Sequence, residues 1–566
     1  MKRDIEQLSQ GTYDVLVVGA GIAGACIAWD AAQRGLRVAL IDKGDFGGAT
    51  SANSMKTVHG GLRYLQDANL PLVRKMIYER KAMMQIAPHL VHPLAFMMPT
   101  THKLMKSKPV MQAAMKLNDM ISFDRNQTGD PQKELPNGHA ISRAECLELM
   151  PGMDASKITG GVVWYDAQMY NSDRMLLSFI LSAVEVGAHV ANYVQADGFL
   201  QDGRQIEGIQ ARDVLTGEAF NIRSRLVINA AGGWTDGLLN AVNGVATKTR
   251  FNLSVAVNLI TPQVYSDYAV ASTSDYTYKD KNGVERHRSN MLLIVPWRQY
   301  SIVGTFHRPY SGHPDEYVLT DEAIAEYLNE VNTAHPGVNL KPEDVLWHHE
   351  GFVPMEEGGD EYDGIDLVRE DSIHDHSSED GVDGLLSVVC VKYTTARALA
   401  EKVVNKALKK LERPSINCRT AVTPIHGGHI KQFLTYLSRQ IADAPYDLKP
   451  PVLEHLVYNY GSAYRQVLKY ITENERWLEP LPGDSDAIAA EVVHSVRSEM
   501  AVKLSDVILR RMELGTGEYP GDDTLEAVAD IMRQELAWTY EKMHQEIAEC
   551  KRIFKRVEEK EPVAAL

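Results

Sequence analysis

Residues 13–45 read YDVLVVGAGIAGACIAWDAAQRGLRVALIDKGD. The run 13–18 is apolar and rich in β-branched residues, which is typical of a strand buried on both faces. Glycines at 19, 21 and 24 then form the pattern G-x-G-x-x-G, and a helix of small residues follows and ends near Gly35. A second apolar strand ends in Asp42. This order of strand, glycine turn, helix, strand and acid predicts a Rossmann-like dinucleotide-binding unit.

Each glycine of the pattern has a physical role. Gly19 permits a tight turn, Gly21 lets the backbone approach a pyrophosphate, and Gly24 lets the helix pack closely on the strand. The helix N-terminus offers N–H groups and a positive dipole end to the phosphates, and Asp42 can accept hydrogen bonds from ribose hydroxyls. We therefore expect cofactor contacts at Gly19, Gly21, Ile22, Ala23, Gly24, Asp42 and Lys43. The pattern alone does not distinguish FAD from NAD.

Composition limits the class of protein. The chain has 566 residues, enough for several domains, and a net charge of −16, which argues against binding nucleic acid. Its five cysteines are widely spaced, so neither a disulfide framework nor a metal site is expected. The N-terminus lacks the apolar core of a signal peptide, and no apolar run is long enough to span a membrane. We expect a cytoplasmic protein.

Residues 46–66, FGGATSANSMKTVHGGLRYLQ, carry a more specific signal. This segment resembles one found in the FAD-dependent glycerol-3-phosphate dehydrogenases, a branch of the flavoprotein superfamily that includes D-amino-acid oxidase. The resemblance implies that the cofactor is FAD and that the segment passes beside the flavin at Thr50, Ser51, Ser54, Lys56, His59, Gly60, Gly61 and Leu62. It also implies that Arg63 and Tyr64 reach the substrate.

Other stretches extend the resemblance over nearly the whole chain. The stretch 164–193 resembles the family segment that leads into the strand beside the adenosine, so Val194 is expected there. LVINAAGGWTDGL (226–238) is similar to a second flavin motif and implies cofactor contacts at Ala231, Gly232 and Trp234. The stretch 384–410 predicts a strand, a loop and a helix whose N-terminus lies near the flavin, with Lys392, Tyr393 and Thr394. The helix dipole and Lys392 would stabilise the reduced flavin.

The predicted fold class is α/β. A Rossmann-like FAD-binding domain of the glutathione-reductase type comprises residues 1–100, 150–240 and 380–412. A substrate domain with an antiparallel sheet and a lobe comprises 101–149 and 241–379. Helical periodicity predicts an all-α C-terminal domain over 430–566.

The sequence departs from the family pattern around the substrate. Where the family carries a K-G-[ST]-H motif, this chain has Val255 and Asn258, and Val353 replaces an arginine expected to hold the substrate. Arg369 remains, and His307 and Arg308 lie side by side in the stretch TFHRPY. Either His307 and Arg308 restore the lost functions from another strand, or the pocket accepts a different substrate.

The resemblance implies oxidation of glycerol 3-phosphate to dihydroxyacetone phosphate, with hydride transfer to flavin N5 and electrons passed to a quinone or, alternatively, to oxygen. Arg63, Lys392 and His307 are the expected catalytic residues, with His59 as a second candidate base. Substrate contacts are expected at Arg63, Tyr64, Arg308, Arg369 and Asn258.

Two alternatives stay open for the function. The substrate can be another small hydroxylated or aminated acid or a polyol, or the chain can bind flavin without turnover. The Met- and Lys-rich stretch 96–122 either lies on a membrane surface, on the inner face of the plasma membrane, or packs as a lobe of the protein. A homodimer is also compatible with the sequence.

Overall fold

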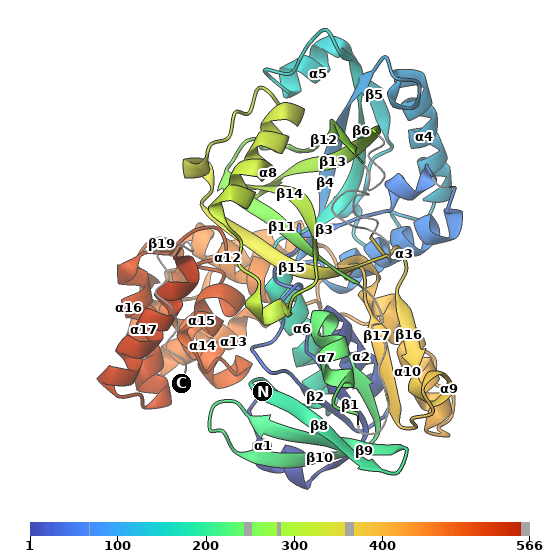
Figure 1. Cartoon of the computed structure of the whole chain (residues 1–566). Coiled ribbons are helices and arrows are strands. Elements are labelled where there is room, and N and C mark those ends of the chain that lie inside the picture. Colours follow the sequence, from blue (N-terminus) through green and yellow to red (C-terminus); the bar gives the residue numbers. More distant parts are fainter. Residues whose placement is uncertain (67, 243–251, 280–284, 357–366, 556–566) are drawn as a thin grey trace.

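The computed structural model describes residues 1–566 except 67, 243–251, 280–284, 357–366 and 556–566. Parts of the predicted substrate and C-terminal domains therefore lie outside the described residues. Figure 1 shows a lower domain built on one sheet, an upper domain built on a second sheet, and a group of helices at the left that belongs to the end of the chain.

The lower domain contains the predicted dinucleotide-binding unit. Its parallel strands run in the order β17-β10-β1-β2-β7, with β16 antiparallel at one edge and a β8–β9 hairpin extending from β10. The strands are β1 (Thr12–Val18), β2 (Val38–Ile41), β7 (His189–Ala191), β8 (Val194–Asp202), β9 (Gln205–Asp213), β10 (Ala219–Asn229), β16 (Ser372–Asp375) and β17 (Leu385–Val389). The three predicted segments of the FAD-binding domain thus meet in one sheet.

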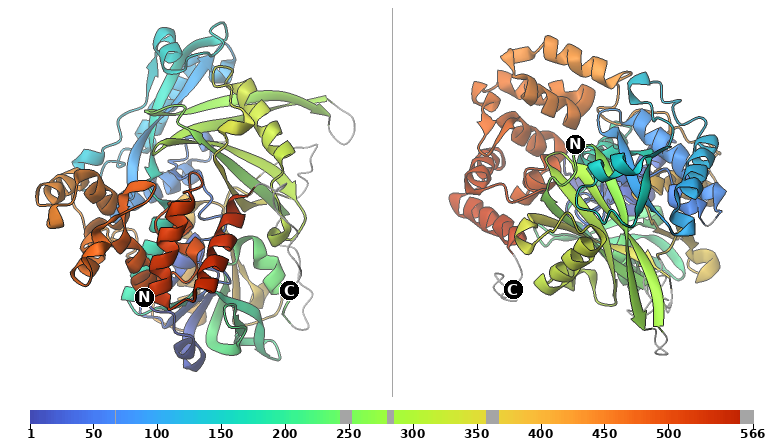
Figure 2. Two further views of the ribbon diagram at one scale, coloured as in Figure 1. Left: turned by 90° about the vertical axis from the view of Figure 1, so that its left-hand side faces the viewer. Right: turned by 90° about the horizontal axis from the view of Figure 1, so that it is seen from above.

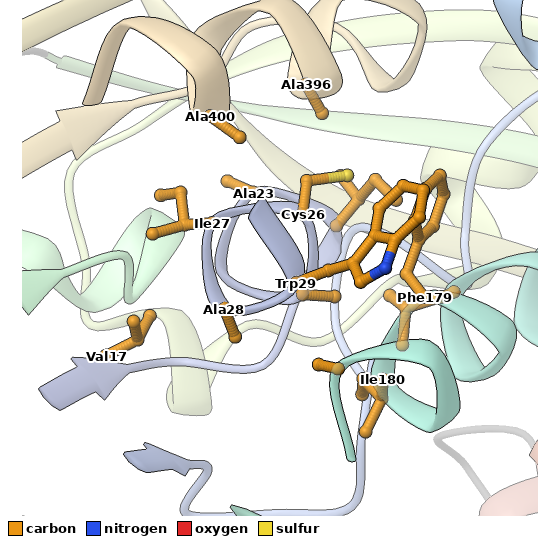
Figure 3. Packing of buried hydrophobic residues seen from close by; sticks show 14 of the residues in the cluster. Val17, Ala23, Cys26, Ile27, Ala28, Trp29, Phe179, Ile180, Ala396 and Ala400 are labelled. Carbon is orange, nitrogen blue, oxygen red and sulfur yellow. The ribbon is translucent and has the colours of Figure 1, made fainter. Parts of the chain in front are cut away.

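Helix α2 (Ile22–Gln33) forms the centre of this domain. It is buried from Ile22 to Ala32, mostly with small and apolar residues, and packs between α6 (Ser172–Glu185) and α10 (Ala396–Lys410). Figure 3 shows Ala396 and Ala400 above the helix and Phe179 below it, beside the indole ring of Trp29. Small residues on two faces let the neighbouring helices approach, while Trp29 fills the remaining space.

The upper domain is a mixed sheet in the order β15-β11-β14-β13-β12-β4-β6-β3, with β5 beside β6. Most pairs are antiparallel, as predicted, but β12 and β4 run parallel. The strands are β3 (Thr57–Val58), β4 (Val91–Thr101), β5 (His139–Ile141), β6 (Ile158–Met169), β11 (Asn252–Pro262), β12 (Tyr268–Lys279), β13 (Glu285–Trp297), β14 (Tyr300–Tyr310) and β15 (Trp347–Met355). The predicted domain boundaries were therefore wrong for β3, β4 and β6, which belong to this sheet because their edges pair with its strands.

Helices cover the upper sheet. These are α4 (Lys108–Ile121), α5 (Arg143–Leu149) and α8 (Asp321–Ala334), whereas Met83, Met84 and Ile86 of α3 (Leu70–Ile86) pack in the core of the lower domain. Helix α8 packs its apolar face on one side of the sheet, and α4 lies near β6 and β5. Short helices α1 (Ile5–Gln10), α7 (Thr235–Leu239) and α9 (His376–Glu379) complete the lower domain.

The C-terminal domain is helical, as predicted, with a small hairpin of β18 (Pro480–Leu481) and β19 (Asp484–Ile488). Its helices are α11 (Phe433–Ala442), α12 (Pro450–Tyr460), α13 (Tyr464–Leu468), α14 (Ala489–Glu499), α15 (Leu504–Asp506), a π-helical turn at Val507–Arg511, α16 (Asp522–Leu536) and α17 (Tyr540–Phe554). Figure 2 shows that this domain covers one flank of the other two. In the described part of the chain, no helix is both long enough and apolar enough to cross a membrane.

The packing of α2 on the glycine turn gives a stability prediction. A Cβ added at Gly24 would lie 1.9 Å from the carbonyl oxygen of Gly19, which is backbone and cannot turn aside. We expect Gly24→Ala to lower the free energy of unfolding by about 1–3 kcal/mol, as overpacking of a rigid site does. Denaturant unfolding measures this change.

Gly237 provides the matched control, because a Cβ there meets nothing within 4 Å. Gly237→Ala should leave the free energy of unfolding unchanged or raise it slightly. Equal effects of the two substitutions would contradict the close approach of α2 to the turn.

Candidate active site

A cavity of about 1250 Å³ lies between the two sheets and is lined by residues from distant parts of the chain. Its floor is formed where β1, β10 and β17 end, at the carboxyl edge of the parallel sheet. Ligands of open α/β sheets bind at this edge. Its roof comes from the upper sheet, through residues of β11, β14 and β15.

The glycine turn and the start of α2 form one wall, with Gly21, Ile22 and Ala23. The Ile22 N–H donates to Ser51 Oγ at 3.0 Å, so the turn is held against the segment that the family resemblance places beside the flavin. Thr50, Ser51, Ser54, His59, Gly61 and Leu62 also line the cavity. A helix N-terminus with backbone N–H groups at the wall is the arrangement that binds a pyrophosphate.

The ends of β10 and β17 bring further residues to the cavity, among them Gly232, Lys392, Tyr393 and Thr394, which the sequence analysis predicts as cofactor contacts. Ala230 and Gly232 follow β10, and the stretch from Cys390 to Thr394, which includes Lys392 and Tyr393, follows β17; all of them line the cavity. Gly232 has a φ of +57°, a conformation that a residue with a side chain rarely adopts. The volume of the cavity, the helix N-terminus and the glycine backbone together fit an extended dinucleotide such as FAD.

Several predicted cofactor residues lie behind this wall. Gly19 and Gly24 shape the turn, and Ala231 and Val194 are also outside the cavity lining. The carboxylate of Asp42 accepts from the N–H groups of Ala20 at 2.7 Å and Gly44 at 2.9 Å. Burial raises its pKa to about 6, although the two N–H groups oppose this. Asp42 thus stabilises the glycine turn through these hydrogen bonds and does not line the cavity.

Lys43 and Trp234 share a different partner. Both bond Asp315, and the Lys43 ammonium lies 4.4 Å from the centre of the Trp234 ring. They form a small cluster that does not line the cavity. Its contacts instead join the lower domain to the loop after β14.

The prediction for Lys56 requires a correction. Its ammonium is fully buried, donates to Ser172 Oγ at 2.8 Å and lies 3.6 Å from Asp173. It therefore points away from the cavity, into an ionic cluster under the C-terminal domain. A sequence cannot predict this direction, because the partners of Lys56 come from α6.

Arg63 lies on a short helix at the cavity. Gly61 has a φ of +81° and starts the short helix Leu62–Leu65, which presents Arg63 and Tyr64 to the cavity. The Arg63 side chain is exposed to the cavity. Lys392 comes from the segment after β17; its ammonium lies 5.4 Å from the centre of the Tyr64 ring and donates to the carbonyl oxygen of Arg369.

His307, on β14, faces the same space. Burial and, to a smaller extent, the positive charge of Arg63 together lower its pKa to about 4. Its Nδ1 atom is buried and has no hydrogen-bond partner within the described residues. The low pKa keeps the imidazole neutral near pH 7.

Asn258 lies beside His307, at a register shift between β11 and β14. Its amide nitrogen donates to the carbonyl of Asn53 at 3.1 Å, and its amide oxygen accepts from the Thr305 hydroxyl at 2.8 Å. Bulges of this kind redirect a side chain. Because the amide already bonds both neighbours, Asn258 supports the roof of the cavity.

The remaining predicted substrate residues also line the cavity. Arg308 bonds Glu326 at 3.2 Å and lies over the ring of Tyr327, and Arg369 comes from the segment before β16. Val353 lines the cavity too, whereas Val255 is buried in the core against α8. The wall that the family resemblance expects to be cationic is therefore partly apolar.

Asp166 is a cavity residue that the sequence analysis missed. It is buried, accepts from the Gly60 N–H at 2.6 Å and pairs with Arg80, and it lies 3.6 Å from His59. Burial opposes its ionisation, but Arg80 and His59 outweigh burial and lower its pKa. The only signal in the sequence is an acid inside an apolar strand, and its partners come from other elements.

Comparisons with known proteins agree with this geometry. The family model "FAD dependent oxidoreductase" matches residues 14–390, and the model "C-terminal domain of alpha-glycerophosphate oxidase" matches residues 418–543. A glycerol-3-phosphate dehydrogenase of Synechocystis sp. is 30% identical over 558 residues, covering 96% of this chain and 97% of that protein. The mitochondrial glycerol-3-phosphate dehydrogenase of Homo sapiens is 30% identical over 557 residues, covering 94% and 72%.

A solved structure is similar over the whole chain. The glycerol-3-phosphate dehydrogenase of Bacillus halodurans, complexed with FAD, superposes with a TM-score of 0.75 and covers 99% of this chain and 98% of that one. At 24% sequence identity, this similarity concerns the fold.

The environment of His307 gives a prediction about pH. The charge of Arg63 contributes to the low pKa of His307. Arg63→Met should therefore raise the pKa of His307 above about 4, while burial keeps that pKa below the ordinary 6.5. Carbon-13 NMR of labelled histidine rings measures the titration, and a His307→Gln variant assigns the signal. An unchanged pKa in Arg63→Met would contradict the facing arrangement of the two residues.

Proposed function

This chain belongs to the FAD-dependent glycerol-3-phosphate dehydrogenase family of oxidoreductases, and from that premise we propose that it oxidises the secondary hydroxyl of glycerol 3-phosphate to dihydroxyacetone phosphate. The observation that carries the proposal is the pairing of Arg63 with His307 across one cavity, above the glycine turn. An anion clamp and a neutral imidazole are the two groups that oxidation of an anionic alcohol needs.

Bound FAD supplies the hydride acceptor, and the protein supplies orientation and proton transfer. Arg63 holds the phosphate, since a guanidinium matches phosphate oxygens with two parallel hydrogen bonds. This fixes the carbon chain within the cavity and directs the reacting C–H toward the cofactor wall. Tyr64, Arg369 and Arg308 also line the cavity and are the auxiliary contacts.

His307 is the proposed general base. A free-enzyme pKa of about 4 makes it a weak base, but Arg63 accounts for part of that value. When the substrate phosphate neutralises Arg63, the pKa of His307 rises and the imidazole becomes a better acceptor for the hydroxyl proton. Substrate binding therefore prepares the base for the step it performs.

Lys392 completes the proposed machinery on the cofactor side. It follows β17 and lines the cavity with Tyr393 and Thr394, which begin the short helix that leads directly into α10. A positive charge and a helix N-terminus stabilise the negative charge that a flavin acquires on reduction. This arrangement favours hydride transfer out of the substrate.

A matched pair of histidine variants tests the proposal. In assays of dihydroxyacetone phosphate formation from glycerol 3-phosphate with a quinone analogue, His307→Gln should lower kcat by about 10²–10⁴-fold, the usual contribution of a general base. His59→Gln, which removes the cavity histidine paired with Asp166, should lower kcat by less than about tenfold. Equal losses, or a larger loss for His59→Gln, would contradict the assignment.

The apolar wall favours a second candidate function. Val353 lines the cavity where a further arginine would strengthen phosphate binding. A small carboxylate needs one clamp, so Arg63 alone suits a hydroxylated or aminated acid. Turnover of such an acid with no product from glycerol 3-phosphate would establish this alternative, with quinone or oxygen as the electron acceptor.

The Met- and Lys-rich stretch 96–122, with Phe123 directly after it, supports a further proposal, that the enzyme lies on a membrane surface and passes electrons to a quinone there. Exposed fractions are 76% for Leu104, 63% for Met105, 74% for Met120 and 77% for Phe123, and lysines 103, 108 and 116 lie among them. Apolar side chains beside cations suit an anionic lipid surface. Met105 also lines the cavity, which brings this surface close to the cofactor site.

Vesicle binding tests the membrane proposal. Met120→Asp combined with Phe123→Asp should weaken co-sedimentation with phosphatidylglycerol-containing vesicles at least tenfold, since each buried large apolar side chain contributes about 1.5–3 kcal/mol. Val422→Asp, at an apolar residue that is 57% exposed elsewhere, is the control and should bind like the parent. Unchanged binding of the double variant would contradict the proposal.

A further inference from the structure

The C-terminal domain reaches the cofactor site through a set of fully buried charges. The cofactor loop, residues 42–56, connects β2 to β3 and contributes Thr50, Ser51, Asn53, Ser54 and Met55 to the cavity. Both ends of this loop carry a buried charged residue, Asp45 at the start and Lys56 at the end. Each of them meets the C-terminal domain.

Asp45 is held by two arginines of the π-helical turn. Its carboxylate accepts from Arg511 Nη1 at 2.7 Å and Nη2 at 2.9 Å, and from Arg510 Nε at 2.5 Å. Asn192 adds a hydrogen bond at 2.8 Å. Burial opposes the charge on Asp45, but the two guanidinium groups outweigh burial and hold its pKa well below the ordinary range.

Lys56, at the other end of the cofactor loop, interacts electrostatically with Glu513, which follows Arg510 and Arg511 in the C-terminal domain. Glu513 is buried, pairs with Arg298 and interacts with both Lys56 and Asp173. Glu513 has a φ of +53°, a left-handed conformation that costs energy for a residue with a side chain. Arg510 and Arg511 therefore hold the start of the cofactor loop by direct hydrogen bonds, and Glu513 acts on its end electrostatically, through the charges of Lys56 and Asp173.

The anchored cofactor loop is hydrogen-bonded to two walls of the cavity in which FAD would bind. Between its two anchored ends, Ser51 Oγ accepts the first N–H of α2, and the Asn53 carbonyl accepts from Asn258 in the roof. Buried ion pairs add little net stability compared with apolar packing, but they fix geometry because an unpaired partner is costly. π-Helical turns are also frequent at functional sites.

We propose that Arg510, Arg511 and Glu513 are positioning residues that hold the cofactor loop in its FAD-binding shape, so that the C-terminal domain controls FAD retention. The inference rests on FAD binding, which membership of the family establishes, and not on the identity of the substrate. A chain that oxidises something other than glycerol 3-phosphate would leave it intact.

The rate of FAD release from the full-length holoprotein, followed by the rise in flavin fluorescence, tests the proposal. Asp45→Asn combined with Arg511→Met removes the pair while leaving no unpaired carboxylate, and should speed FAD release at least tenfold. Arg511→Lys keeps the charge with fewer hydrogen bonds, and should release FAD at an intermediate rate. If the double variant does not fold, Arg511→Lys alone still tests the proposal.

The control is the Asp30–Arg34 pair, which is equally buried but lies at the far end of α2. Asp30→Asn combined with Arg34→Met should lower the unfolding temperature of the holoprotein while leaving FAD release within about twofold of the parent rate. Equal acceleration in both double variants would show a general loss of stability and overturn the proposal. No acceleration in the Asp45 and Arg511 variants would overturn it as well.

Discussion

The close packing of α2 on the glycine turn is the constraint on which the rest of the structure depends. With Gly24 against the carbonyl of Gly19, no side chain fits between helix and turn, so the N-terminus of α2 is fixed at the carboxyl edge of the sheet. The strands β10 and β17 end at the same edge, and the chain segments that follow them complete the cavity floor. Every catalytic proposal relies on that fixed floor.

The sequence predicted this part well because its signals are local. A glycine turn, an apolar strand and a helix of small residues lie within about thirty residues, and each has a direct steric reason. The segment with Gly61 and Arg63 was recognised from its motif, and Arg63 lines the cavity. The FAD cofactor follows from the family to which the chain belongs.

Features that depend on distant partners were not predictable. Lys56 turns away from the cavity because Ser172 and Asp173, more than a hundred residues later, hold its ammonium. The parallel pairing of β4 with β12 and the role of Asp166 likewise arise from tertiary contacts. The same holds for Asp45, whose partners Arg510 and Arg511 follow 465 and 466 residues later.

Arg63, Arg308 and Arg369 line the cavity together with the neutral His307, while Val353 stands where the family resemblance expects a further arginine, so the cavity leaves the choice between a phosphate and a carboxylate to experiment. The most direct test is therefore anaerobic reduction of the bound flavin, followed by the loss of its yellow absorbance. The account predicts fast bleaching by glycerol 3-phosphate and none by lactate, glycerol or D-alanine. Bleaching by a non-phosphorylated acid, with none by glycerol 3-phosphate, would contradict it and would assign Arg63 to a carboxylate.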